Sequence, residues 1–258
     1  MAPFPEAWSG YLEANVPHYR YLSETEREVL QGDLRVFIAE KHWEAFGGLE
    51  LTDEIRVTIA AQACLLTLCL PDNLYPNVRS IYVYPTAYVA PERTVGPDGV
   101  VTEGESVRLG EAWHGGPVVL SWSDVKSGGQ ILGDGHNVVF HEFAHQLDLM
   151  DGEVDGYPRL HEDGDYPRWQ AAMNDEWAFL LEQAEQGRAT VLDHYGATSA
   201  GELFAVATEA FFEKPRQLHE RHPQLYQVLK EYYRQDPRER LEAASLIFTA
   251  ESAEAADE

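Results

Sequence analysis

One stretch decides how this chain folds: Asn137-Val138-Val139-Phe140-His141-Glu142-Phe143-Ala144-His145-Gln146-Leu147-Asp148. It places two histidines four residues apart, with a glutamate directly after the first. On a helix this spacing puts His141 and His145 on one face, where both imidazoles can bind a single tetrahedral ion. Zinc is the metal that the pattern favours. Glu142 is then placed to take a proton from the attacking water and to pass it to the leaving amine.

The apolar residues of the same stretch indicate a helix that is buried on the side away from the metal. They are Val138, Val139, Phe143 and Leu147. A short motif of this kind also arises by chance, and this apolar context favours the catalytic interpretation over a chance match. A purely structural zinc site is disfavoured, because it would give the adjacent glutamate no role.

A catalytic zinc usually has three protein ligands and a water, so a third ligand is needed. Asp151 stands six residues after His145, where one large class of zinc peptidases has its third ligand, but the glycine expected at the turn is replaced by Asp148. Glu202 and Glu209 are better candidates. They lie seven residues apart, on one face of an otherwise apolar predicted helix, where a carboxylate without a partner is costly. Spacing alone leaves open which of the two binds zinc.

Length and composition favour a soluble protein with one domain. The chain has 258 residues, of which 44% are hydrophobic, and no apolar run approaches the ~18 residues of a membrane-spanning helix. We therefore expect no membrane association. The predicted domain covers residues 1–248, and residues 249–258 are expected to form a disordered acidic tail.

Charge and cysteine content restrict the partners and the compartment. The 44 acidic residues against 19 lysines and arginines give a formal net charge of −25, which disfavours binding to nucleic acid and to anionic lipid. Cys64 and Cys69 are the only cysteines, and their spacing on a predicted helix points them to different faces, so no disulfide is expected. The first residues lack the features of a secretion signal, and we predict a cytoplasmic protein.

The remaining elements indicate an α+β protein. In chain order they are a helix over 23–46 that begins with a capping box and is stopped by two glycines, a helix over 52–70 capped by Thr52, a strand over 78–84, loops and short strands over 85–116, a strand over 117–122, and mainly helices after 137. The strand from Val118 to Trp122 either binds an extended peptide along its edge or lies in the core.

Several further segments are distinctive beside the histidine motif. They are residues 48–63 (GLELTDEIRVTIAAQA), residues 78–84 (VRSIYVY), residues 116–122 (GPVVLSW), and HQLD at 145–148 followed by Asp151-Gly152. Over most of its length the chain thereby resembles the Mlc titration factor A family and, more distantly, the catalytic domain of anthrax lethal factor.

The resemblance implies a gluzincin-like zincin fold, mainly helical with a small mixed sheet, that holds one zinc ion per chain. The third ligand is then Glu202, which opens a Glu-x-Phe-Ala motif seven residues after Tyr195. Tyr195 could donate a hydrogen bond to the oxyanion of the tetrahedral intermediate. Glu209 and Asp148 become outer partners that accept the free N–H groups of the ligating histidines.

Two functions follow from this resemblance. The first is hydrolysis of peptide bonds in small peptide substrates, with cleavage at the amino end as a finer expectation. The alternative is a regulatory binding protein that sequesters a transcriptional repressor of the Mlc kind, with the peptidase fold as a scaffold or a regulated activity. Glu142→Gln distinguishes the two functions: it should abolish the cellular effect of a peptidase and leave the cellular effect of a binding protein intact.

Overall fold

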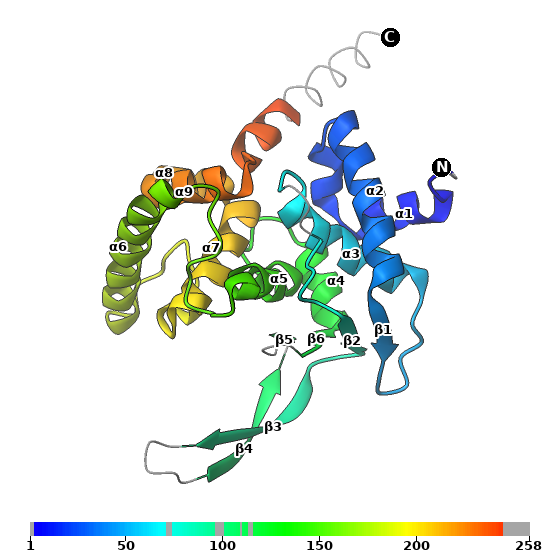
Figure 1. Cartoon of the computed structure of the whole chain (residues 1–258), viewed down its shortest axis with the longest axis horizontal. Helices are drawn as coiled ribbons and strands as arrows, with labels where there is room; N and C mark the ends of the chain where they lie inside the picture. Colours follow the sequence, from blue (N-terminus) through cyan, green and yellow to red (C-terminus); the bar gives the residue numbers. More distant parts are fainter. Residues whose placement is uncertain (1–2, 71–73, 96–100, 109, 113–115, 245–258) are drawn as a thin grey trace.

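A computed structural model describes residues 3–70, 74–95, 101–108, 110–112 and 116–244 (Figure 1). The α-helices are α1 (Glu6–Asn15), α2 (Glu24–Glu40), α3 (Asp53–Thr67), α4 (Trp122–Gln130), α5 (Val138–Asp148), α6 (Tyr166–Glu185), α7 (Ala200–Glu213), α8 (Pro215–Arg221) and α9 (Pro223–Tyr233). Short 3-10 helices are η1 (Pro17–Tyr21), η2 (Leu149–Asp151), η3 (Asp163–Asp165) and η4 (His194–Ala197). The strands are β1 (His42–Ala45), β2 (Ser80–Tyr84), β3 (Tyr88–Val95), β4 (Val101–Arg108), β5 (Gly110–Ala112) and β6 (Val118–Ser121).

A small mixed sheet lies beside the helices. Its strand order is β1-β2-β6-β5, in which β1, β2 and β6 run parallel and β5 is antiparallel to β6. The prediction of a mainly helical protein with a small mixed sheet is therefore confirmed. Every residue of β6 is buried, and β2 and β5 pair with its two sides. Of the two interpretations of this strand, the core strand is correct, because neither of its edges is open to a peptide.

The first long helix ends earlier than predicted. Its capping box is present, since the Ser23 hydroxyl accepts from the Glu26 N–H and the Glu26 carboxylate accepts from the Ser23 N–H. The helix stops at Glu40, and the chain continues as β1 rather than as helix to residue 46. Lys41 takes an extended conformation (φ −86°, ψ 144°) and its buried Nζ donates to the carbonyl of Tyr75 at 2.9 Å. Pairing with β2 thus outweighs the local preference for helix.

Residues 85–116 contain more strand than predicted. β3 and β4 form an antiparallel hairpin of eight residues on each side, which extends away from the helices in Figure 1. Pro91 lies within β3, opposite Glu105. Both strands of a two-stranded ribbon are edge strands, and an edge strand tolerates a residue that lacks an N–H.

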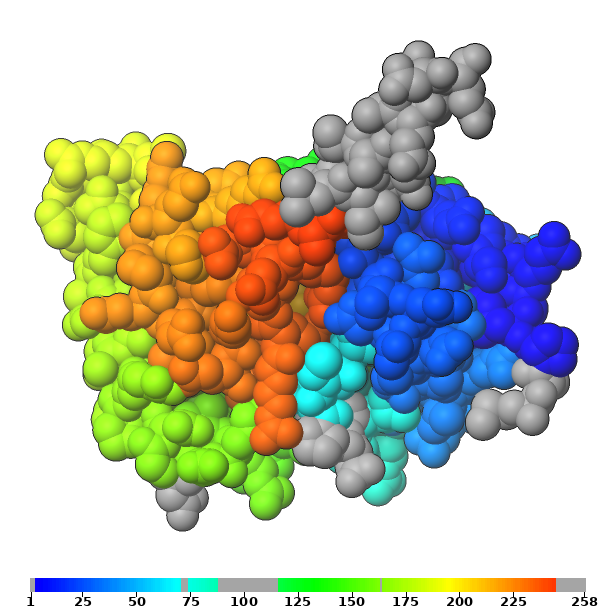
Figure 2. Space-filling model, turned by 90° about the horizontal axis from the view of Figure 1, so that it is seen from above, coloured from blue at the N-terminus to red at the C-terminus, as the bar shows by residue number. Residues whose placement is uncertain are grey.

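The helix that carries the histidine motif lies in the middle of the core. The Phe143 ring contacts Phe37 of α2 and Tyr75, with ring centroids 5.7 and 4.7 Å apart, and the Phe140 ring lies 5.3 Å from Phe212 of α7. Figure 2 shows the C-terminal helices packed directly against the N-terminal helices, and α5 lies between α7 and α3 in Figure 1. Aromatic packing on both sides therefore fixes α5.

Helix α3 begins as predicted, with the Thr52 hydroxyl accepting from Ile55 N, and is buried along nearly its whole length. It ends at Thr67, before the predicted end at residue 70. No helix within the described ranges is both long and apolar enough to cross a membrane. The predicted domain end at residue 248 and the predicted tail over 249–258 lie outside the described residues.

Candidate metal centre

Helix α5 presents both histidines of the motif on one face. Its N-terminus is fixed by Asn137, whose side-chain oxygen accepts from the N–H of Phe140 at 3.0 Å. The imidazole rings of His141 and His145 lie 4.9 Å apart between centroids. The opposite face is apolar and packs into the core, so the histidines face away from it.

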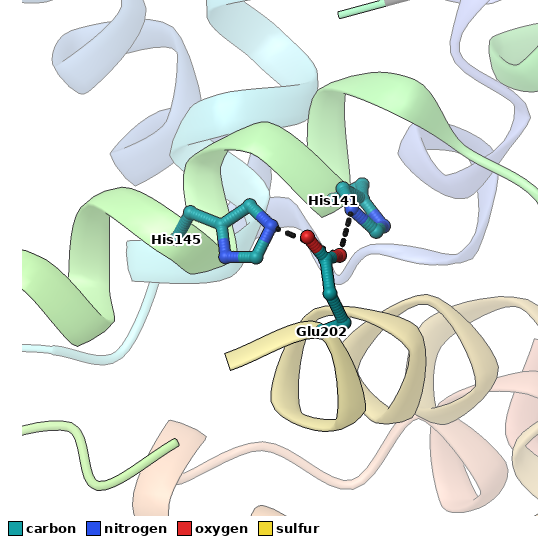
Figure 3. A group of neighbouring side chains, drawn as sticks. All are labelled: His141, His145 and Glu202. Carbon is teal, nitrogen blue, oxygen red and sulfur yellow. Dashed lines mark hydrogen bonds and ion pairs between the residues drawn. The ribbon is translucent and has the colours of Figure 1, made fainter. Parts of the chain in front are cut away.

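Glu202 of α7 meets both histidines (Figure 3). Ser199 caps the start of α7 by accepting from the Glu202 N–H at 3.2 Å. One carboxylate oxygen of Glu202 then lies 3.0 Å from Nε2 of His141 and 3.3 Å from Nε2 of His145. The three ligand atoms lie within 4.8 Å of one another, and among the described residues no other group of three such side chains converges in this way.

The alternative third ligand, Asp151, does not join this group. It is exposed in η2, and its Oδ1 accepts from the N–H of Glu153 at 3.2 Å. The turn at Gly152 has a φ of 107°, which favours glycine, and it follows Asp151 rather than preceding it. The chain therefore turns too late to bring the Asp151 carboxylate back to the histidines.

The arrangement of the three side chains fits a zinc ion. Two imidazole nitrogens and one carboxylate oxygen are a usual ligand set for catalytic zinc. With metal–ligand bonds of about 2.0–2.2 Å, neighbouring atoms of a tetrahedral site are separated by about 3.3–3.6 Å. The separations of 3.0 and 3.3 Å between the Glu202 oxygen and the two nitrogens are close to that range.

The pKa values of His141 and Glu202 are shifted by the contacts between these groups. Burial lowers the pKa of His141, but its hydrogen bonds to Glu202 and Glu209 outweigh burial and hold that pKa well above its usual value. Burial raises the pKa of Glu202, yet the hydrogen bonds from His141 and His145 bring it far below its usual value. A metal ion that binds here would compete with protons for the same imidazole nitrogens and carboxylate oxygen.

Glu209 contacts the opposite nitrogen of His141. Its Oε1 lies 2.7 Å from Nδ1 of His141, and its Oε2 accepts from the backbone N–H of Asn137 at 2.6 Å. Glu209 is 6% exposed and is not part of the converging group. The contact is the one expected of an outer partner, which orients a ligating imidazole and fixes its tautomer.

Asp148 is also buried near the histidines, but its hydrogen bond goes elsewhere. Its Oδ2 accepts from the N–H of Gly156 at 2.8 Å, and burial raises its pKa from 3.8 to about 7. Its Oδ1 and Nδ1 of His145 are both buried and have no hydrogen-bond partner among the described residues. The structure thus does not contain the bond from Asp148 to a histidine, and that role stays a prediction.

A cavity of about 550 Å³ opens in front of the histidine motif. Glu142, which is 5% exposed, lines it together with His141, Tyr195 and Glu209. Tyr195 lies in η4, is 52% exposed, and has its hydroxyl 3.4 Å from Oε1 of Glu202. The expected base and the expected oxyanion donor therefore share one cavity with the ligand His141.

Sequence reasoning missed the acidic wall of this cavity. Asp124 of α4, Asp134 and Asp193 line it, and lysine and arginine are absent from the described lining residues. The three aspartates come from separate segments, and no motif joins them. Asp193 carried a weak signal, since it stands two residues before Tyr195 and its Oδ1 accepts from the Tyr195 N–H at 2.7 Å.

Comparison with known proteins agrees with this geometry. The sequence profile of the family described as "Glucose-regulated metallo-peptidase M90" matches residues 1–234. An uncharacterized protein of Synechocystis sp. is 45% identical over 237 residues, which cover 91% of this chain and 86% of that protein. Mlc titration factor A of Pectobacterium atrosepticum is 31% identical (92% and 89% covered), and that of Klebsiella pneumoniae subsp. pneumoniae is 34% identical (86% and 84% covered).

Proposed function

Because the chain belongs to the glucose-regulated metallo-peptidase M90 family, we propose that it is a zinc-dependent peptidase with a gluzincin-like fold. His141, His145 and Glu202 are the ligands of one zinc ion. The observation that carries the proposal is the position of a single Glu202 oxygen within 3.3 Å of both Nε2 atoms. When bound, the metal supplies a Lewis acid that polarises the scissile carbonyl and activates water.

Glu142 is the general base of this proposal. It follows His141 directly on α5 and lines the cavity, so its carboxylate reaches the space in front of the ligands. There it takes the proton of the attacking water and delivers it to the leaving amine, which needs a carboxylate rather than a carboxamide.

Tyr195 is the oxyanion donor. Its phenol lines the same cavity and reaches Glu202, so its hydroxyl lies on the substrate side of the ligands. Asp148 remains a proposed outer partner of His145, since each has one buried polar atom that lacks a hydrogen bond and His145 electrostatically favours the charged form of Asp148.

Replacing Tyr195 by phenylalanine is expected to lower kcat about 10- to 100-fold, because it removes one hydrogen-bond donor to the oxyanion and leaves the ring in place. Zinc content and thermal stability are expected to match the wild type, since the side chain is half exposed and is not a ligand. Steady-state kinetics and metal analysis test this. A wild-type kcat would remove Tyr195 from the mechanism.

Small peptides with a free amino terminus are the substrates that the cavity favours. Asp124, Asp134 and Asp193 give the wall a negative charge, with Glu142 and Glu209 deeper inside. A protonated α-amino group is attracted to such a wall. The volume of about 550 Å³ suits a short peptide. This supports an aminopeptidase, as the finer form of the proposal.

The purified protein is therefore expected to hold one zinc ion per chain and to cleave an unblocked short peptide faster than the same peptide with an acetylated amino end. A chelator should abolish both rates, and added zinc should restore them. Metal analysis and peptide assays by liquid chromatography measure these quantities. Activity that persists after the zinc has been removed would contradict the proposal, and equal rates on the two peptides would restrict it to an endopeptidase.

A second candidate is a regulatory binding protein. It is favoured by the relatives named Mlc titration factor A, which match most of this chain. In that case the chain sequesters a transcriptional repressor, and the net charge of −25 favours a partner with a basic surface while disfavouring nucleic acid itself. The two candidate functions can be distinguished by measuring whether a catalytically inactive variant still binds an Mlc-type repressor.

The cytoplasm is the proposed compartment. Cys64 is buried, Cys69 is exposed, and both are free thiols. Free thiols persist in reducing compartments, whereas proteins of oxidising compartments usually pair their cysteines.

A further inference from the structure

Asn137 lies where the histidine-bearing helix meets the rest of the core. It is 1% exposed, and its Oδ1 caps α5 through the Phe140 N–H. Its Nδ2 donates to Oε1 of Gln62 on α3 at 2.9 Å, with longer contacts of 3.4 Å to the carbonyl of Gly128 and to Oε1 of Glu213. Its backbone N–H donates to Oε2 of Glu209 at 2.6 Å. One residue thus both begins α5 and holds the carboxylate that contacts Nδ1 of His141.

The two side-chain amides can adopt only one arrangement. The Phe140 N–H requires an acceptor, so Oδ1 of Asn137 must face it and Nδ2 must face Gln62. Gln62 then presents its oxygen to Asn137, and its Nε2 donates to the carbonyl of Thr58 at 3.2 Å. Gln62 is fully buried, and a buried amide that loses its partner pays a desolvation penalty. The pair is therefore locked in orientation.

Helix α4 closes the space around this pair. A Cβ on Gly128 would lie 3.0 Å from the carbonyl of His136 and 3.1 Å from Cα of Asn137. A Cβ on Gly129 would lie 2.7 Å from the carbonyl of Asn15 and 3.0 Å from Nε2 of Gln62. The two glycines let the α4 backbone pack directly on the amides, which leaves them little room for a second position.

We propose that Gln62 and Asn137 are positioning residues for the metal centre. Gln62 fixes Asn137, the Asn137 N–H fixes Glu209, and Glu209 orients the imidazole of His141. The proposal rests on the proposed function of His141, His145 and Glu202 as a metal centre. It assigns a role to α3, whose Gln62 belongs neither to the ligand group nor to the described lining of the cavity.

Gln62→Met tests this, because methionine has a similar length and volume but cannot accept the Asn137 amide. Zinc affinity of the full chain, measured by competition with a chromophoric chelator, is expected to fall about 10-fold, at the lower end of losses for outer partners. Asn137→Ser should give a similar loss, since serine keeps the cap of α5 but lacks the amide donor. It serves as the second variant if the first does not fold.

Gln130→Met is the control. It removes another amide–amide hydrogen bond of 2.9 Å, between the exposed Gln130 of α4 and Asn15 of α1. The carboxylate of Glu209 contacts His141 and Asn137 instead. The zinc affinity of Gln130→Met and the visible spectrum of its cobalt-substituted form are expected to match the wild type. The cobalt spectrum of Gln62→Met should differ, because the spectrum reports ligand orientation rather than overall stability.

A double variant shows whether the effect passes through Glu209. In a Glu209→Ala background, Gln62→Met is expected to lower zinc affinity no further, because the carboxylate that it positions is gone. Additive losses of zinc affinity would contradict the proposed positioning of His141 by Gln62 through Asn137 and Glu209. Equal zinc affinities of Gln62→Met and Gln130→Met would contradict it as well. If the wild-type protein bound no zinc, both the proposed metal centre and the proposed role of Gln62 would be wrong. If the wild-type protein bound zinc and Gln62→Met bound it with equal affinity, only the role of Gln62 would be wrong.

Discussion

Glu142→Gln is expected to lower kcat about 10³-fold while one zinc ion per chain stays bound. The carboxamide has nearly the same shape but cannot accept the proton of the attacking water. Glu142 is outside the converging ligand group, so its loss leaves the metal in place. Turnover of an unblocked peptide and metal analysis of the same preparation measure the two effects.

Glu176→Gln is the matched control for this variant. Glu176 is 7% exposed on α6 and its Oε2 lies 2.8 Å from Nδ1 of His222, so the control changes a buried glutamate of the same type that does not line the cavity. It should keep wild-type turnover. Wild-type turnover in Glu142→Gln would mean that another group is the base. Undiminished binding of an Mlc-type repressor by Glu142→Gln would show that binding and catalysis are separate.

Glu202→Ala is expected to weaken zinc binding by more than about 100-fold, beyond the loss typical of an outer partner. The variant leaves two imidazoles and solvent to hold the ion. Glu209→Ala should lose only about 10- to 100-fold, because it removes the group that orients His141 and leaves all three ligands. Competition titration with a chelator compares the variants on one scale.

Asp151→Ala is the control for the alternative third ligand. Its carboxylate is exposed and accepts from the Glu153 N–H, so its removal should leave zinc affinity unchanged. If Asp151→Ala or Glu209→Ala emptied the site while Glu202→Ala kept its zinc, the ligand set would be wrong. The proposed role of Tyr195, whose hydroxyl contacts Glu202, would then lose its basis.

The histidine pair could be predicted because its geometry is local. A spacing of four residues on a helix determines that His141 and His145 share a face, whatever the rest of the chain does. Glu202 could not be identified as a ligand in this way, since it is 61 residues from His141 in sequence. Glu209 lies on the same side of the same helix and was an equal candidate by spacing. Family resemblance favoured Glu202, and the packing of α5 against α7 brings that carboxylate to both rings.

Contacts that form only in the folded chain explain what could not be predicted from the sequence. Residues after Glu40 continue an acceptable helix pattern, but β2 offers them hydrogen-bond partners that only the folded sheet supplies. The N–H of Gly156, which bonds to Oδ2 of Asp148, could not be predicted either, because no motif joins these two residues. The role of Gln62 could not be predicted, because a single glutamine within a buried helix forms no motif. Its partner, Asn137, comes beside it only in the folded chain.

The distance in sequence between the ligands also matters for folding. An ion held by α5 and α7 closes a loop of about 60 residues that includes α6 and η4, and closing so long a loop removes much of the freedom of the unfolded chain. Ligation energy in such a site is folding energy as well. If the proposed zinc is bound, it would therefore stabilise the fold as well as supply chemistry, and its removal is expected to lower the stability of the segment that joins α5 to α7.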